Sequence, residues 1–283
     1  MKKLLLIAAL GLSVMTAKAV EASFTYDAGF DVVSAYVWRG MYNGGLSFQP
    51  NLAVGYETEN TSFSAGVWGS VGASDWKFQK GLPETEDGNP NTYFIPELDI
   101  ILSYSFYGAT IGITHYYYCD GGNFFSWESA ESIAESGNGS QTEINVGYTL
   151  KDLVDVDFFI NWNTFIAGND INENEDGTVK RAYSSYFELG YNHEFPLGFT
   201  LGGVVGMSPW KSDYYMNNGF AVVNIGLSLN KEWETDVCTI DLYAQGSINP
   251  DGINKENAYI KDAGDFKLYN QKLNGLIGLG IWF

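Results

Sequence analysis

Positive charge is scarce in this chain of 283 residues, which has 15 Lys and Arg against 34 Asp and Glu and a formal net charge of -19. Binding to nucleic acid depends on clustered basic side chains that neutralise phosphates. An acidic chain with so few basic residues lacks the charge for that task. We therefore expect no nucleic-acid partner.

Long apolar runs are missing after the first twenty residues, so no segment there can cross a membrane as a helix, which takes about 20 apolar residues. The one early run, residues 4–14, follows two lysines and precedes Ala17-Lys18-Ala19. Basic residues, a short apolar run and small residues in this order are typical of a secretory signal peptide. We predict a signal peptide over residues 1–19 and a single mature domain over residues 20–283.

Apolar and aromatic residues are nevertheless abundant, at 45% and 16% of the chain, while the mean hydropathy is only -0.11. This combination suits a membrane barrel, in which half of each strand faces lipid and the other half faces water.

The C-terminal residues alternate with a period of two. Apolar residues or glycine occupy Leu273, Gly275, Ile277, Leu279, Ile281 and Phe283. Such a pattern predicts a strand with one apolar face. Gly278, Ile281 and Phe283 also match the C-terminal signal of outer-membrane proteins, although Leu276 stands where that signal prefers a polar residue. We expect the barrel assembly machinery to bind this strand, which ends at Phe283.

The same alternation predicts eleven further strands, each close to the length of about 10 residues that a tilted spanning strand needs. The twelve predicted segments are residues 24–38, 46–57, 62–71, 94–106, 109–118, 141–150, 154–166, 182–195, 199–208, 220–230, 237–248 and 268–283. On their apolar faces we expect contact with outer-membrane lipid at Phe30, Val54, Ile100, Phe158, Leu189 and Ile225.

Connections between these segments alternate in length. Short links rich in turn residues fall at 58–61, 107–108, 151–153 and 196–198, with a somewhat longer one at 231–236. The other links are mostly long, at 72–93, 119–140, 167–181, 209–219 and 249–267, with a short one at 40–45. This asymmetry is typical of outer-membrane barrels. The predicted fold is therefore an all-β, single 12-stranded antiparallel transmembrane β-barrel with short periplasmic turns and long extracellular loops.

Only two cysteines are present, Cys119 and Cys238. An even count in an exported protein raises the possibility of a disulfide. The predicted topology instead places them at opposite ends of the barrel, farther apart than a disulfide allows. We expect two reduced thiols.

The faces opposite the apolar ones carry carboxylates and amides, which are costly to bury unpaired. Two interpretations remain open: these side chains line an aqueous passage, or Arg39, loops and inward aromatics such as Trp68 and Tyr243 close it. The predicted pore-lining residues are Asp27, Asp31, Arg39, Glu97, Asp99, Asp157, Asn161, Asn163, Glu188, Asp241 and Gln245. Carboxylates at middling heights in the lumen would favour cations.

Catalysis and metal binding have little support in the sequence. The only histidines, His115 and His193, fall on apolar faces without a recognisable serine motif beside them, so we predict no enzyme. Residues 170–177 resemble the opening of a calcium loop, but Glu175 stands where that loop needs glycine. We interpret the segment as an acidic outer loop, and we expect no cofactor.

Near the predicted mature N-terminus, one motif resembles a known family. It consists of Ser34-Ala35-Tyr36-Val37-Trp38-Arg39-Gly40, followed by Gln49-Pro50 and then by Gly66-Val67-Trp68-Gly69-Ser70. These elements resemble the TorF-type porins, exported bacterial barrels that carry a Gcw_chp domain. The resemblance implies an outer-membrane location and a channel role, and it implies no substrate and no catalytic residues. The long acidic loops of this chain depart from it.

Taken together, these observations predict a porin-like channel in the bacterial outer membrane for passive diffusion of small polar solutes, cationic or neutral. The alternative is a non-conducting outer-membrane barrel that binds a ligand or partner through its acidic extracellular loops.

Overall fold

In the computed structural model, the described residues are 22–72, 96–119, 123–125, 127–136, 139–174, 176–250 and 273–283. The predicted signal peptide over residues 1–19 lies outside them. Most of the predicted outer loops at 72–93 and 249–267 lie outside them as well.

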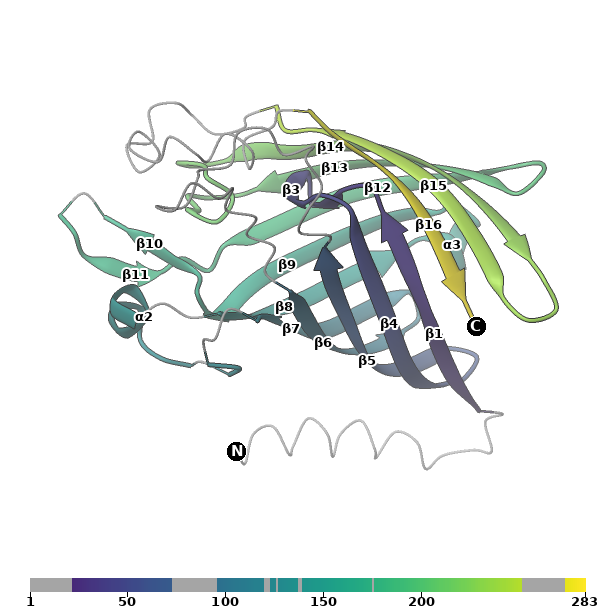
Figure 1. The fold of residues 1–283 in the computed structure, drawn as a ribbon, viewed down its shortest axis with the longest axis horizontal. Helices are drawn as coiled ribbons and strands as arrows, with labels where there is room; N and C mark the ends of the chain where they lie inside the picture. The colour runs from purple at the N-terminus through teal and green to yellow at the C-terminus, as the bar shows by residue number, and fades with distance from the viewer. Residues whose placement is uncertain are drawn as a thin grey trace, which may run out of the picture.

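Twelve antiparallel strands form one closed barrel, which confirms the predicted fold class (Figure 1). The barrel strands are β1 (Ser23–Val33), β4 (Ser47–Glu57), β5 (Thr61–Gly72), β6 (Glu97–Phe106), β7 (Ala109–Tyr118), β8 (Ser140–Thr149), β9 (Phe158–Gly168), β12 (Ser185–Phe195), β13 (Phe199–Ser208), β14 (Ala221–Glu234), β15 (Thr239–Ile248) and β16 (Leu273–Trp282). Each pairs with its neighbours in the chain, and β1 pairs with β16 to close the barrel. None of the helices in the described ranges is long and apolar enough to span a membrane.

Alternation of side chains gives the wall two different faces. Along β4, Phe48, Leu52 and Val54 point outward and are 44%, 52% and 44% exposed, whereas Ser47 and Gln49 point inward and are buried. The protein therefore exposes its large apolar side chains on the outside and turns its polar ones inside. This is the reverse of a water-soluble domain.

The barrel has two distinct ends. We call the end where short turns join consecutive strands the turn end, and the opposite end the loop end. Turns after β4, β6 and β12 are short, as predicted. The link after β8 is longer than predicted because residues 151–154 form a short helix, α3 (Lys151–Val154), so β9 begins at Phe158 and not at residue 154. The link after β14 is shorter than predicted, because β14 continues to Glu234.

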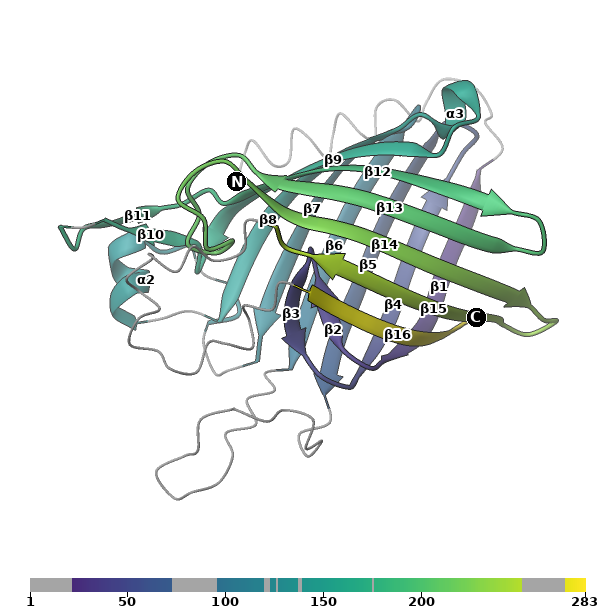
Figure 2. The same ribbon diagram turned by 90° about the horizontal axis from the view of Figure 1, so that it is seen from above.

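The first strand differs most from its prediction, since β1 ends at Val33 rather than at residue 38. Beyond Ser34, residues 36–44 form a separate hairpin of β2 (Tyr36–Trp38) and β3 (Met41–Gly44). Its two tip residues, Arg39 and Gly40, have φ of 49° and 78°, as a tight primed turn requires. Both views draw this hairpin within the outline of the barrel (Figures 1 and 2).

Contacts on several sides hold the hairpin inside the lumen. The Asn274 side-chain amide on β16 donates to the Gly40 carbonyl at 2.6 Å. The rings of Tyr36 on β2 and Trp68 on β5 lie 5.6 Å apart, and a side chain at Gly40 would meet Asn224 on β14. The β2–β3 hairpin thus bridges opposite parts of the wall and forms a plug in the loop-end half.

Three smaller elements lie at the loop end: α2 (Ala130–Ser136), β10 (Ile171–Glu173) and β11 (Val179–Arg181). The segment predicted as an acidic loop that resembles a calcium loop therefore lies partly in the β10–β11 hairpin. Asp213, in the connection after β13, links to this hairpin, because its carboxylate accepts the Glu173 backbone N–H at 3.0 Å.

Cys119 and Cys238 form no disulfide. Cys119 follows β7 at the loop end, and Cys238 precedes β15 at the turn end.

Candidate functional site in the barrel lumen

The predicted pore-lining residues fall into groups of different exposure. On the inner face Asp27 is exposed, whereas Asp31, Asn161, Glu188, Asp241 and Gln245 are half-buried. Nearer the loop end, Glu97, Asp99 and Asn163 are buried, with 6% to 8% of their surface exposed. The lumen therefore has a solvent-accessible turn-end half and a filled loop-end half.

Asp157 is placed differently from the prediction. It precedes β9 at the turn end, where it accepts a hydrogen bond from the Asn192 amide at 3.3 Å and lies 3.8 Å from the Lys151 ammonium. Asp99 is buried toward the loop end. Asp157 at the turn end and Asp99 toward the loop end thus lie at different heights along the barrel, and not both at the middling heights that the sequence predicts.

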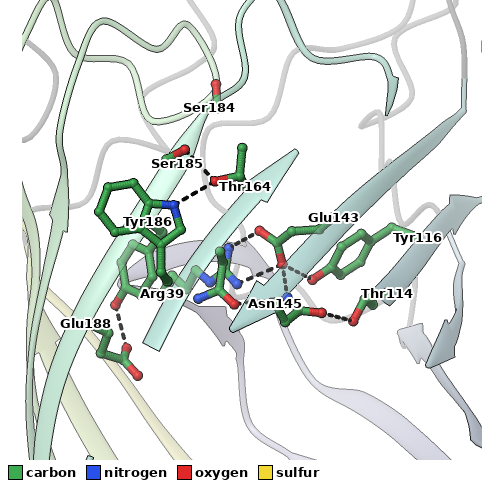
Figure 3. Close-up of polar contacts among 12 residues, drawn as sticks. Arg39, Thr114, Tyr116, Glu143, Asn145, Thr164, Ser184, Ser185, Tyr186 and Glu188 are labelled. Atoms are coloured by element: carbon green, nitrogen blue, oxygen red, sulfur yellow. Dashed lines mark hydrogen bonds and ion pairs between the residues drawn. The ribbon is translucent and has the colours of Figure 1, made fainter. Parts of the chain in front are cut away.

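Arg39 lies between Glu143 and Tyr186 in the filled half (Figure 3). Its guanidinium forms a bidentate ion pair with Glu143 on β8, with N–O distances of 2.6 and 2.9 Å. It also donates to the Tyr215 hydroxyl, which belongs to the connection after β13, at 2.8 Å. A two-pronged guanidinium–carboxylate contact is among the strongest polar contacts in proteins and fixes the orientation of both groups.

Aromatic rings enclose the same guanidinium. Its central carbon lies 4.2 Å from the centroid of the Trp38 ring and 4.8 Å from that of Tyr186 on β12. Both distances are within the range of cation–π attraction, which strengthens when water is excluded. Arg39 therefore joins the plug to β8, to β12 and to the connection after β13.

Glu143 is fully buried, yet both oxygens of its carboxylate accept hydrogen bonds (Figure 3). Besides Arg39, it accepts hydrogen bonds from the Tyr116 hydroxyl at 2.9 Å and from the Asn145 amide at 2.8 Å. Asn145 in turn donates to Asn163 at 2.9 Å and accepts from Thr114 at 2.8 Å. A buried carboxylate is stable only with such partners, so this network makes the charged plug contact possible.

Aromatic packing fills the remaining space around the plug. Trp38 contacts Tyr116 and Tyr214 with ring centroids 5.9 and 6.0 Å apart, and Tyr214 contacts Phe165 at 4.8 Å. Burial raises the pKa of both Tyr214 and Tyr215, so their hydroxyls stay neutral. Neutral hydroxyls can donate to the acidic groups around them.

Tyr243 in the middle of β15, one of the inward aromatics that the sequence suggests could close the lumen, lies along the wall. A side chain at Gly278 on β16 would lie 2.2 Å from the Tyr243 ring, so the ring lies against the wall over this glycine. Its hydroxyl bonds to the Asp31 carboxylate. Trp68 by contrast does pack against the plug, through Tyr36.

Glu143 is absent from the predicted pore-lining residues, although it anchors Arg39. Tyr186, Tyr116 and Tyr215 were missed as well. Alternation along β7 and β12 could have placed the first two inward. No local signal identifies Tyr215, because its position depends on how the connection after β13 folds back.

The histidines lie on the outer face, as predicted. His115 Nδ1 is 2.9 Å from the Thr142 hydroxyl and its Nε2 is 2.6 Å from the Phe124 carbonyl oxygen. His193 Nδ1 lies 3.2 Å from the Tyr191 hydroxyl. These contacts involve threonine, tyrosine and a backbone carbonyl, and none of them couples a histidine to a serine nucleophile.

The closed barrel, its apolar outer wall and its polar interior define the class of protein. In lipid, backbone N–H and C=O groups must be satisfied within the protein, and a closed barrel achieves this with strands. Antiparallel barrels that are apolar outside and polar inside are the spanning structures of the bacterial outer membrane. The chain is an outer-membrane β-barrel.

Comparison with solved structures yields barrels of the same kind. Salmonella typhi OmpF in complex with daunomycin is 10% identical, with 93% of this chain and 97% of that chain covered and a TM-score of 0.38. The NanC porin is 11% identical, with coverage of 92% and 99% and a TM-score of 0.46. The COG4313 outer membrane channel from Pseudomonas putida F1 is 12% identical, with coverage of 94% and 96% and a TM-score of 0.38.

No protein-family model matches the chain, and no curated protein matches its sequence. The function proposed below therefore depends on the residues of the chain itself.

Proposed function

We propose that the protein is a porin-like channel of the bacterial outer membrane that lets small polar solutes diffuse passively. The observation that carries this proposal is the polar, solvent-accessible inner face of the turn-end half. Asp27 is exposed there, and Asp31, Asp241 and Gln245 are half-buried. Unpaired carboxylates are stable in a barrel interior only where water reaches them.

The plug makes the loop-end half the narrow part of the path. Solutes that enter from the turn end meet Arg39, Trp38 and Tyr215 before they reach the other side. We therefore expect a low conductance, set by the space around the hairpin and not by the width of a 12-stranded barrel.

A preference for cations or neutral solutes follows from the charges of the lumen. The one basic residue of the predicted pore lining, Arg39, is neutralised by its ion pair with Glu143. Asp27 and Asp31 lie on β1 and Asp241 lies on β15, with β16 between these two strands, and none of the three forms an ion pair with a described residue. Carboxylates that face a water-filled passage attract cations and repel anions.

Conductance of the purified protein in a planar lipid bilayer tests the proposal. Discrete current steps are expected, with a reversal potential in a salt gradient that shows cation preference. Asp27→Asn, Asp31→Asn and Asp241→Asn together should weaken that preference, and so should high ionic strength. Glu59→Gln serves as the matched control, because this exposed carboxylate lies in the turn after β4 and not on the inner face.

Anion preference, or a reversal potential that the triple variant leaves unchanged, would contradict the proposed selectivity. A folded, inserted barrel that gives no steps would contradict the channel itself and would leave a barrel whose acidic outer loops bind a partner.

Membership of the TorF-type porin family, cleavage after residue 19 and recognition by the barrel assembly machinery are further parts of this proposal. Phe283 directly follows β16; its side chain is 62% exposed, and its backbone N–H donates to the Ala28 carbonyl on β1 at 2.8 Å. Removal of Phe283 should reduce the amount of inserted barrel in cells. The N-terminal residue of the mature protein tests the cleavage site.

A further inference from the structure

We propose that Glu97, Asp99 and Ser70 form a binding site for one divalent cation of the calcium type in the inner wall of the loop-end half. Glu97 and Asp99 lie on β6, and Ser70 lies on the neighbouring strand β5. This site goes beyond the proposed channel function, since cation binding at the wall does not require that solutes pass.

Register places the three side chains together on the inner face. Ser70 is the direct antiparallel partner of Glu97, which brings their Cβ atoms to about 5 Å. Glu97 and Asp99 are two residues apart on one strand, so their Cα atoms are about 7 Å apart and both side chains point to the lumen. The outward residue between them, Leu98, is 37% exposed, which confirms the orientation.

All three side chains are withdrawn from solvent. Glu97 and Asp99 are 7% and 6% exposed, and Ser70 is 0% exposed. Two oxygens of the group are buried without a hydrogen-bond partner, Asp99 Oδ1 and the Ser70 hydroxyl. Native proteins rarely leave buried polar atoms unpaired, and each instance calls for an explanation such as a bound ion.

No positive side chain in the described ranges compensates these carboxylates. Glu97 receives a hydrogen bond from the neutral Tyr36 hydroxyl of the plug. The charged groups that act on Asp99 are Glu97 and Glu143, both of which are acidic. Arg39 is the nearby cation, and its guanidinium is already bound to Glu143 through both prongs. Two buried carboxyl groups thus remain without a positive partner among the described residues.

The chemistry of the donors selects the ion. Carboxylate and hydroxyl oxygens are hard ligands, which calcium accepts in flexible sets of six to eight completed by water. One doubly charged ion would balance both carboxylates at once. Magnesium demands a near-ideal octahedral arrangement and gives up its water reluctantly, so it should bind this site more weakly.

Calorimetric titration of the folded, chelator-treated barrel with calcium chloride tests the site. The acidic loops can bind further ions, so the informative quantity is the difference between variants. Asp99→Asn and Glu97→Gln should each reduce the calcium stoichiometry by one ion per chain or lower the affinity for that ion at least tenfold. Glu59→Gln, which changes an exposed carboxylate in the turn after β4, is the control and should leave the titration unchanged.

Terbium luminescence provides a second readout. Trp68 is the direct partner of Asp99 on β5, so terbium bound at this site should be sensitised by excitation of the indole. Asp99→Asn should abolish that signal and also the rise in thermal stability on calcium addition. Asp99→Asn replaces a buried carboxyl group with a neutral amide of nearly the same size, so the variant should still fold.

Equal calcium stoichiometry and affinity in the wild type and in the Glu97→Gln, Asp99→Asn double variant would overturn the proposal, as would a wild type that binds no calcium. If the wild type binds no calcium, a proton shared between Glu97 and Asp99 would explain why the two carboxyl groups can be buried together. The absence of current steps in a bilayer would contradict the proposed channel function but would not contradict this cation site.

Discussion

At the scale of single residues, the structure depends on how buried charges find partners. Glu143 is fully buried and receives four hydrogen bonds, from Arg39 twice, from Tyr116 and from Asn145. The Asp170 carboxylate, beyond the end of β9, accepts hydrogen bonds from Ser184, including its backbone N–H at 2.8 Å, and Asp170 Oδ1 is buried without a partner. The Glu143 carboxylate is therefore fully paired, whereas the buried Asp170 carboxylate is only partly paired.

Replacement of Arg39 should loosen the plug. Arg39→Met leaves Glu143 buried with a charge but without its ion pair, and loss of one partner of a buried pair destabilises a protein by roughly 3–5 kcal/mol. We expect a lower free energy of unfolding in detergent and a larger single-channel conductance. Arg39→Met combined with Glu143→Gln should be more stable than the sum of the single effects indicates, since neither charge is then left alone. Additive effects would show that the two groups are not coupled.

Asp170 should make stability depend on pH. Burial raises the pKa of Asp170, with hydrogen bonds from Ser184 and the charge of Arg181 acting in the opposite direction, and with Asp213 adding to the increase. A folded-state pKa above the unfolded one means that stability is lost as pH rises through the folded value. Asp170→Asn should therefore stabilise the barrel at pH 7 and have little effect below the ordinary pKa of aspartate.

Asp176→Asn is the control, because the pKa of Asp176 is shifted in the opposite direction to that of Asp170. Hydrogen bonds from Thr178 lower the pKa of Asp176, which is exposed in the β10–β11 hairpin. Its contribution is present above the ordinary pKa and is lost on acidification. Urea unfolding in micelles at pH 4 and pH 7 measures both variants. A stabilisation by Asp170→Asn that is equal at the two pH values would contradict the assignment.

At the scale of elements, the β2–β3 hairpin decides the shape of the lumen. Its turn requires positive φ at Arg39 and Gly40, and the hairpin would not fit beside β14 if Gly40 carried a side chain. A Cβ there would lie 2.9 Å from Asn224 Oδ1 and 3.0 Å from the Val223 carbonyl oxygen. The hairpin therefore depends on glycine for both its backbone and its approach to the wall.

Gly40→Val should displace the hairpin tip and increase conductance while the barrel still forms. Gly177→Val is the matched control, because Gly177 has the same φ of 78° but nothing within 4 Å of a Cβ, in an exposed hairpin. Gly177→Val introduces the same backbone strain without a clash, so the comparison shows the effect of the clash with β14 alone. Equal conductance in both variants and the wild type would show that the hairpin does not restrict the passage.

At the scale of the whole molecule, stability in lipid depends on an apolar outer wall. Ile225 on β14 and Val54 on β4 point outward and are 39% and 44% exposed. They come from opposite parts of the chain and yet belong to one continuous surface, because the barrel closes between β1 and β16. Large exposed apolar side chains around a barrel are the expected match for hydrocarbon.

Arginine on this wall should destabilise the folded barrel. Val54→Arg or Ile225→Arg is expected to lower the free energy of unfolding in lipid by about 2 to 4 kcal/mol near the bilayer midplane. Asn51→Arg, three residues before Val54 on the inner face of β4 and half-buried, is the control and should be tolerated better. Unfolding of the variants in liposomes by guanidinium measures the difference. Tolerance of arginine at both outward positions would place them away from lipid.

The sequence by itself determined the wall. Period-two alternation predicted twelve strands, and β7 and β13 begin and end at the predicted residues. It also assigned residues such as Val54 and Asp31 to opposite faces. These features follow from the sequence because the choice between lipid and lumen is made residue by residue along each strand. The predicted last residue of β1 and the predicted first residue of β9 were wrong, since the apolar alternation continues into the plug and into α3.

Only the tertiary structure decided what fills the lumen. Arg39 meets Glu143 and Tyr215, which are 104 and 176 residues away along the chain, and stacks on Tyr186. Each of these side chains has an ordinary local pattern, so no window of sequence indicates the contact. Closure of the barrel brings strands from the whole chain around one interior, and the groups that meet there depend on register, on the tilt of the strands and on which connections fold inward.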